Sequence, residues 1–201
     1  RDRHVRPDGD AIGSCLGLYH YLKRKKHDAR IVAPTEFPRY LKWMPAARTI
    51  VKHDKEPEVC VKLIEKAEII FCLDFNTLNR AEDLEPHLKK SDVTYIMIDH
   101  HIAPGDFAKY KFWDEKASST AELVYDFVME LGDGHLLKNK YLASCLYAGI
   151  VMDTGLFLYN STTPRCHEIT AELMKTGMDL EYIHDRIFNQ YGENRLRFMG
   201  N

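Results

Sequence analysis

Acidic and imidazole side chains recur in this sequence where apolar runs end. An Asp-His-His tripeptide, residues 99–101, follows the apolar run 93–98, and Asp74 follows a second apolar run, 69–72. Ligands of open α/β sheets bind outside the carboxyl ends of the strands, so polar side chains at such positions can converge without being buried unpaired. We therefore expect these residues to form one site.

Two further segments carry residues of the same types. The segment 4–10 precedes a helical pattern that begins near Ala11, and Asp153 follows the apolar segment 146–152. Carboxylates and imidazoles without thiolates suit Mn(II), Mg(II), Fe(II) or Zn(II), and a carboxylate-rich set favours the harder ions, of which we expect manganese. The candidate residues are His4, Asp8, Asp10, Asp74, Asp99, His100, His101 and Asp153.

The number of aspartates indicates which chemistry this set could perform. Two metal ions about 3.5–4 Å apart can share a carboxylate, acidify a water and neutralise the charge on a transferring phosphoryl group. General acid/base catalysis would need only two carboxylates with separated pKa values. Four ionised aspartates balance the charge of two divalent cations, so the set favours hydrolysis of a phosphate ester by a two-metal mechanism.

Strand and helix patterns alternate through the first 120 residues, and helices dominate afterwards. This order is typical of βαβ units with a parallel sheet. It predicts a three-layer α/β/α fold whose mainly parallel sheet has about five strands. Strands are predicted at 30–33, 69–73, 93–98 and 110–113, and helices at 13–22, 59–67, 78–88, 118–132, 140–152, 163–177 and 180–189.

Composition narrows the class of protein. The chain has 201 residues, of which 45% are hydrophobic, so it can bury one sizeable core. Its apolar runs are shorter than the roughly 18 residues that cross a bilayer, and its start lacks a signal-peptide pattern, so we expect a cytoplasmic protein. The five cysteines are scattered without a C-x-x-C pair, which predicts reduced thiols. A net charge of −2 argues against duplex DNA as a partner.

The ordered motifs resemble those of the DHH phosphoesterase superfamily. They are the stretch 4–14 (HVRPDGDAIGS), Asp74, the tripeptide 99–101 and the tripeptide 153–155. An isolated Asp-His-His would be a weak signal, but the ordered set is specific. Within the superfamily, the segment 117–120 and the chain length look most similar to the bacterial nano-RNases and 3′-phosphoadenosine 5′-phosphate phosphatases.

The resemblance implies a site with two Mn(II) ions, in which Asp74 bridges the pair; Mg(II) or other divalent ions are the alternatives. It would place the remaining ligands on both sides of that bridge. One ion would be held by His4, Asp8 and Asp74, and the other by Asp10, Asp74, His100 and Asp153.

Catalytic and substrate contacts are also implied. His101 would face the substrate phosphate, and Asp99 would orient a ligand histidine through a hydrogen bond. Ser118 and Ser119 precede a predicted helix, where they could contact phosphate at the helix start or serve as a simple N-cap. Arg165 also lies at a predicted helix start, where a cation opposes the helix dipole, so it either contacts an anionic substrate or is a solvated surface residue.

The resemblance further implies a domain organisation. Residues 1–190 would form the DHH catalytic domain, and residues 191–201 would begin a helix that connects to an absent substrate-binding domain. His4 should follow a strand, yet only three residues precede it, so we expect a fragment.

The resulting prediction is a metal-dependent phosphoesterase that hydrolyses short oligoribonucleotides, 3′-phosphoadenosine 5′-phosphate, or both. The alternatives are a DHH-type hydrolase acting on cyclic dinucleotides, polyphosphate, pyrophosphate or single-stranded nucleic acid, and a non-catalytic nucleotide-binding module. The expected partner is a small phosphoester or short oligonucleotide rather than a membrane. The sequence leaves undecided whether the chain forms a homodimer.

Overall fold

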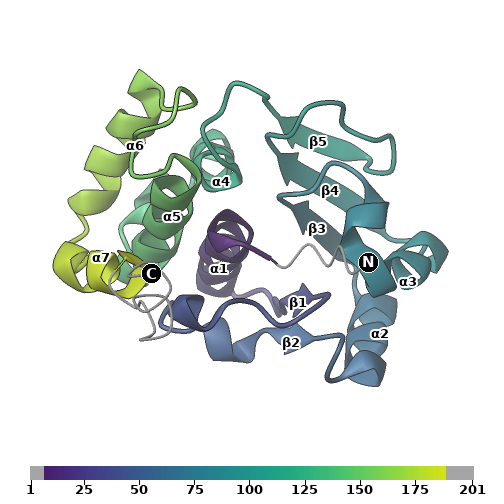
Figure 1. The fold of residues 1–201 in the computed structure, drawn as a ribbon. Helices are drawn as coiled ribbons and strands as arrows, with labels where there is room; N and C mark the ends of the chain where they lie inside the picture. The colour runs from purple at the N-terminus through teal and green to yellow at the C-terminus, as the bar shows by residue number, and fades with distance from the viewer. Residues whose placement is uncertain (1–6, 189–201) are drawn as a thin grey trace, which may run out of the picture.

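A computed structural model describes residues 7–188, which form helices around parallel strands (Figure 1). Strand β3 (Ile69–Leu73) pairs in parallel with β4 (Thr94–Asp99), which pairs in parallel with β5 (Tyr110–Trp113). A separate parallel pair joins β1 (Val32–Ala33) to β2 (Val51–Lys52). The predicted α/β class is confirmed, and the five strands of the described residues are divided between two sheets. Strand β2 was not predicted, because only two consecutive apolar residues, 50 and 51, mark it, whereas three, 31–33, mark β1.

The register of β3 and β4 aligns the ends of both strands. Leu73 pairs with Ile98, and the backbone N–H of Asp74 donates to the Ile98 carbonyl at 3.2 Å, which extends the pairing by one residue. In Figure 1 the arrowheads of both strands point toward helices α1, α4 and α5. Residues that follow β3 and β4 therefore face the ends of these helices.

Helices α1 (Gly9–Arg24) and α5 (Lys140–Asp153) cross with their backbones in contact. A Cβ atom added at Gly13 would lie 2.6 Å from the Cys145 carbonyl oxygen and 2.9 Å from the Gly149 nitrogen. Only glycine leaves room for so close an approach of two main chains. The crossing brings the start of α1 and the end of α5 to the same place.

The remaining helices surround this pair and the sheet. The predicted helix 78–88 is wrong in one respect: a 3-10 turn covers Leu78–Leu84, and α3 begins only at Glu85. Pro86 lies in the first turn of α3, where its missing N–H costs no hydrogen bond, so it starts this helix rather than ending one. The other helices are α2 (Pro57–Lys66), α3 (Glu85–Lys90), α4 (Thr120–Glu130), α6 (Pro164–Met174) and α7 (Leu180–Phe188); short 3-10 turns cover Arg39–Leu41, Ala47–Thr49 and Gly134–Leu137.

The largest hydrophobic cluster surrounds α5. Its side chains Leu142, Leu146 and Ile150 are fully buried among residues of α1, α4, α6 and α7. Burial of such side chains is the main favourable term in folding. The five cysteines are free, as their spacing predicts, and four of them are buried. Within residues 7–188, we find no helix that combines the length and the apolar character needed to span a bilayer.

Candidate metal centre

Carboxylates and imidazoles from four segments converge where β3 and β4 end. Asp74 follows β3, His100 follows β4, Asp10 lies in the first turn of α1, and Asp153 is the last residue of α5. The Nε2 atom of His100 lies 3.4 Å from Asp153 Oδ2, 3.8 Å from Asp74 Oδ1 and 3.9 Å from Asp10 Oδ2. One imidazole nitrogen is thus within 4 Å of three carboxylates. The structure brings together four of the predicted metal ligands.

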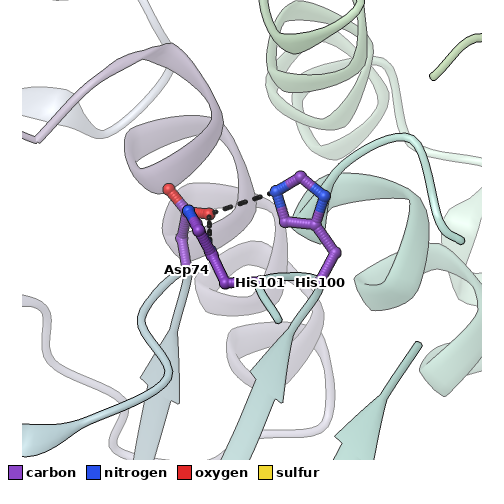
Figure 2. A group of neighbouring side chains, drawn as sticks. All are labelled: Asp74, His100 and His101. Carbon is purple, nitrogen blue, oxygen red and sulfur yellow. Dashed lines mark ion pairs between the residues drawn. The ribbon is translucent and has the colours of Figure 1, made fainter. Parts of the chain in front are cut away.

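These residues form two neighbouring sets of potential ligands. Asp74, His100 and His101 make up one set, and Asp10, His100 and Asp153 make up the other; within each set the ligand atoms lie within 4.8 Å of one another. Figure 2 shows both imidazoles turned toward the Asp74 carboxylate, with His101 Nδ1 at 3.8 Å from Asp74 Oδ1. His100 belongs to both sets, so the two positions adjoin.

The carboxylate of Asp10 is held by the start of α4. Its Oδ2 accepts a hydrogen bond from the Thr120 N–H at 2.6 Å, and its Oδ1 accepts one from the Ala121 N–H at 2.9 Å. The first N–H groups of a helix lack partners within the helix, and the positive end of its dipole favours an anion. Asp10 is 1% exposed, so α4 compensates part of the cost of burying this charge.

Asp74 occupies a backbone conformation that non-glycine residues rarely adopt. Its φ is +63°, in the left-handed region, which turns the chain sharply after β3. Its Oδ1 accepts a hydrogen bond from Thr120 Oγ1 at 3.0 Å. Thr120 therefore positions two carboxylates, Asp10 through its backbone and Asp74 through its hydroxyl. Sequence reasoning missed this role, since a threonine at a helix start is explained equally well as part of a cap.

The electrostatics of the centre fit a divalent cation. Burial raises the pKa of both Asp10 and Asp74 well above the usual range, and repulsion from Asp153 on the first and from Asp10 on the second adds to it. Burial also raises the pKa of Asp153, which ends a helix at the negative pole of its dipole. Crowded carboxylates with raised pKa values are unfavourable by themselves, and carboxylate oxygens with imidazole nitrogens are suitable donors for hard divalent metals.

Two predicted ligands lie before α1. Asp8 is the N-cap of this helix, and its Oδ1 accepts hydrogen bonds from the backbone N–H groups of Asp10 and Ala11 at 3.0 and 3.1 Å. Its charge also contributes to the raised pKa of Asp74, so Asp8 lies near the centre. His4 lies outside the described residues.

Asp99 orients His101 and not His100. It is fully buried, and its Oδ1 lies 2.8 Å from His101 Nδ1. His100 Nδ1 lies instead 3.3 Å from the carbonyl oxygen of Ala117. Strand β4 ends at Asp99, so strand alternation does not govern the two histidines that follow, and both imidazoles face the Asp74 carboxylate. Asp99 thus contacts the histidine that is expected to face the substrate, and the predicted ligand His100 has a backbone carbonyl beside its Nδ1 instead.

The side chains of Ser118 and Ser119 are fully buried and have structural partners. Ser119 is the N-cap of α4, where its Oγ accepts from the Glu122 N–H at 3.1 Å. Ser118 donates to the Glu122 carboxylate through its hydroxyl and, at 3.0 Å, through its backbone N–H. Ser119 therefore acts as the N-cap, and the Ser118 hydroxyl is bound by the side chain of Glu122.

Arg165 lies in a different environment, at the start of α6. It forms ion pairs with Asp126 on α4 and with Glu168 one turn further along α6. With Lys111 and Trp113 of β5 it lines a surface hollow between β5 and α4. Its guanidinium is thus paired with acidic side chains of α4 and α6.

Comparison with known proteins assigns the family. Residues 3–150 match the family model described as the DHH family, N-terminal domain. The chain belongs to the DHH family. The matched range contains Asp10, Asp74, His100 and His101, while Asp153 lies just beyond it.

Curated DHH relatives include two bifunctional oligoribonuclease and PAP phosphatase NrnA proteins. The one from Thermus thermophilus is 33% identical over 184 residues, which is 92% of this chain and 52% of that protein. The one from Bacillus subtilis is 32% identical over 195 residues, 96% of this chain and 56% of that protein. The chain thus spans about half the length of these relatives.

Solved structures agree with the DHH fold. An exopolyphosphatase-related protein from Bacteroides fragilis superposes with a TM-score of 0.93 at 41% identity, over 96% of this chain and 57% of that one. A putative family II inorganic pyrophosphatase from Methanococcus jannaschii gives a TM-score of 0.61 at 18% identity, over 90% of this chain and 57% of that one. The second likeness shows the fold alone.

Proposed function

We propose that this chain is the catalytic part of a metal-dependent phosphoesterase that hydrolyses short oligoribonucleotides, 3′-phosphoadenosine 5′-phosphate, or both. The observation that carries the proposal is the position of His100 Nε2, within 4 Å of three aspartates that come from separate segments. The names of the NrnA relatives support this substrate class.

The proposed cofactor is a pair of Mn(II) ions, with Asp74 between them. Divalent ions held there would supply Lewis-acid activation of water and neutralise charge that develops on the phosphoryl oxygens. The proposed ligands are His4, Asp8 and Asp74 on one side, and Asp10, Asp74, His100 and Asp153 on the other.

His101 and Asp99 have a different role in this mechanism, that of handling a proton beside the substrate. A carboxylate only accepts hydrogen bonds, so the 2.8 Å contact places a proton on His101 Nδ1. The other ring nitrogen, Nε2, then faces away from Asp99 and can hold a proton against a phosphate oxygen. In this role His101 would donate its Nε2 proton to the departing oxygen, while the contact with Asp99 holds the imidazole ring in its orientation.

A second candidate substrate is polyphosphate. The exopolyphosphatase-related protein from Bacteroides fragilis has the same fold over 96% of this chain. Two adjoining metal sites would suit hydrolysis of a phosphoanhydride as well as that of a phosphoester. Substrate comparison must therefore include both.

The test uses the natural full-length protein with Mn(II). Wild type, Asp74→Asn and the control Asp92→Asn, whose side chain is exposed before the amino end of β4, are assayed on 3′-phosphoadenosine 5′-phosphate, on di- to pentanucleotide RNAs and on polyphosphate. We expect Asp74→Asn to lower kcat/KM on the nucleotides by about 100-fold or more, and Asp92→Asn to leave it unchanged. Equal nucleotide hydrolysis by wild type and Asp74→Asn, or hydrolysis of polyphosphate alone, would contradict the proposal.

A further inference from the structure

The loop that follows α5 has an unusual backbone. Directly after the proposed ligand Asp153, the consecutive residues Gly155, Leu156 and Phe157 have φ values of +55°, +64° and +63°. Left-handed backbone is accessible to glycine but rare for residues with a Cβ atom, above all in succession. Such conformations persist only where the surrounding structure determines them, and they cluster at functional sites.

A buried threonine holds this loop in place. The Thr154 carbonyl accepts hydrogen bonds from the N–H groups of Leu158 and Tyr159, both at 3.0 Å. The Thr154 hydroxyl donates to the Ile150 carbonyl at 2.7 Å and accepts from the Phe157 N–H at 3.1 Å. Thr154 itself is fully buried at the end of α5. Three hydrogen bonds that Thr154 accepts thus fix the path of the chain as far as Tyr159, and the fourth ties Thr154 to α5.

A side chain of the same loop is anchored on its inner side. The ring of Phe157 packs against the ring of His167 on α6, with 4.9 Å between the ring centroids, and contacts the main hydrophobic cluster. The next two side chains point the other way, since Leu158 is 79% and Tyr159 is 61% exposed. The loop therefore presents Tyr159 to solvent from a fixed backbone.

The ring of Tyr159 lies flat against the chain. A Cβ atom added at Gly155 would lie 2.5–2.7 Å from the Cζ, Cε1 and Cε2 atoms of Tyr159. A point nearly equidistant from these three atoms lies over the ring face, so one face of the ring covers Gly155 and the opposite face is open. Gly155 is two residues from Asp153, a span of at most about 7 Å. The ring of Tyr159 therefore belongs to the loop that begins directly after a proposed metal ligand.

We propose that the open face of Tyr159 is a stacking platform for a nucleobase of the substrate whose phosphate lies at the metal centre. The inference rests on the proposed function and narrows it to nucleotide substrates. Every base has a π-face, so an aromatic ring accepts bases with little regard to sequence. A ring held by Gly155 loses little freedom when a base covers it, which reduces the entropic cost of binding. Inorganic polyphosphate has nothing to stack on this ring.

The test compares two substrates that differ by the base alone, 3′-phosphoadenosine 5′-phosphate and ribose 3,5-bisphosphate. In the natural full-length protein, Tyr159→Ala should lower kcat/KM for the nucleotide about 5- to 150-fold, mainly through KM, and leave that for the sugar bisphosphate unchanged. Tyr159→Phe keeps the ring and should retain wild-type values on both substrates.

Tyr141→Ala is the matched control. Tyr141 is 51% exposed and lies at the opposite end of α5, so the same truncation there should change neither substrate's kcat/KM. Unchanged kinetics of Tyr159→Ala, an equal loss on both substrates, or a loss in Tyr159→Phe as large as in Tyr159→Ala would overturn the platform. Should wild type hydrolyse no nucleotide, the proposed function fails separately. Equilibrium binding of 3′-phosphoadenosine 5′-phosphate then decides, and equal Kd values for wild type and Tyr159→Ala would overturn the platform as well.

Discussion

Asp74→Asn removes one charge from the metal centre with little change of shape. Asparagine tolerates left-handed backbone better than other residues with a Cβ atom, and its amide oxygen can still accept the 3.0 Å hydrogen bond from the Thr120 hydroxyl. Burial and the charge of Asp10 raise the pKa of Asp74, so in the absence of metal its ionised form is less favourable in the folded chain than in the unfolded one. We expect the variant, in chelator, to be at least as stable as wild type.

The difference should emerge when metal is added. At a free metal concentration of about 100 times Kd, binding to the native state adds about 2.7 kcal/mol to the free energy of unfolding. For a chain of this size that corresponds to a rise in Tm of roughly 5–11 °C. Loss of a shared carboxylate that weakens affinity about 100-fold would reduce the added stability to about 0.4 kcal/mol, a rise in Tm of about 1 °C.

Thermal unfolding of wild type, Asp74→Asn and Asp92→Asn in chelator and in increasing Mn(II) measures these quantities, and calorimetry counts the ions bound. Asp92→Asn makes the same chemical change at an exposed position before β4 and should follow the wild-type curve. A metal-dependent rise in Tm that is equal in Asp74→Asn and wild type would refute the placement of Asp74 between the ions. A large loss of stability in chelator would refute the electrostatic reasoning.

Three further changes address other parts of the structure. Asp99→Asn should lower kcat about 10- to 100-fold and preserve the metal-dependent rise in Tm, because it alters the group that orients His101. Steady-state kinetics and thermal unfolding measure both quantities. Loss of the metal-dependent rise in Tm would contradict this prediction. Gly13→Ala should lower the free energy of unfolding, measured in urea, by about 1–3 kcal/mol, because the added methyl group meets the main chain of α5. An unchanged urea midpoint would show that α1 and α5 can move apart to make room for it. Asp133→Asn should lower Tm at pH 7. The hydrogen bond from Lys25 lowers the pKa of Asp133. The ionised carboxylate therefore stabilises the folded chain above the unfolded-state pKa of Asp133, and this stabilisation is lost as pH falls through the folded-state pKa. A difference in Tm between wild type and Asp133→Asn that persists at lower pH would contradict this.

Much of the fold and of the metal centre could be predicted from local sequence. Apolar runs end at Asp74 and at Asp99, and parallel strands place such ends side by side, so the sequence predicts convergence of the residues that follow them. The helix start near Asp10 and the helix end at Asp153 were visible as well, because hydrophobic periodicity marks both helices.

Contacts that depend on tertiary packing could not be predicted in the same way. Thr120 binds two carboxylates only because α4 docks on α1, and the Ala117 carbonyl reaches His100 only because the chain after β5 returns to the centre. Asp99 contacts His101 rather than the adjacent His100 because the chain bends after β4, and the path of that bend decides which side chains meet. Neither the boundary at Glu85 nor the short strand β2 has a hydrophobic period from which it could be read.

The hydrogen bonds between Asp10 and the first N–H groups of α4 join residues 110 positions apart in the chain. A partner so remote in sequence is acquired only after the intervening segments have packed, since closing long loops costs entropy before any contact repays it. Only the fully folded chain would then bind the ions tightly, and unfolded or partly folded copies in a cell would compete poorly for scarce divalent metal.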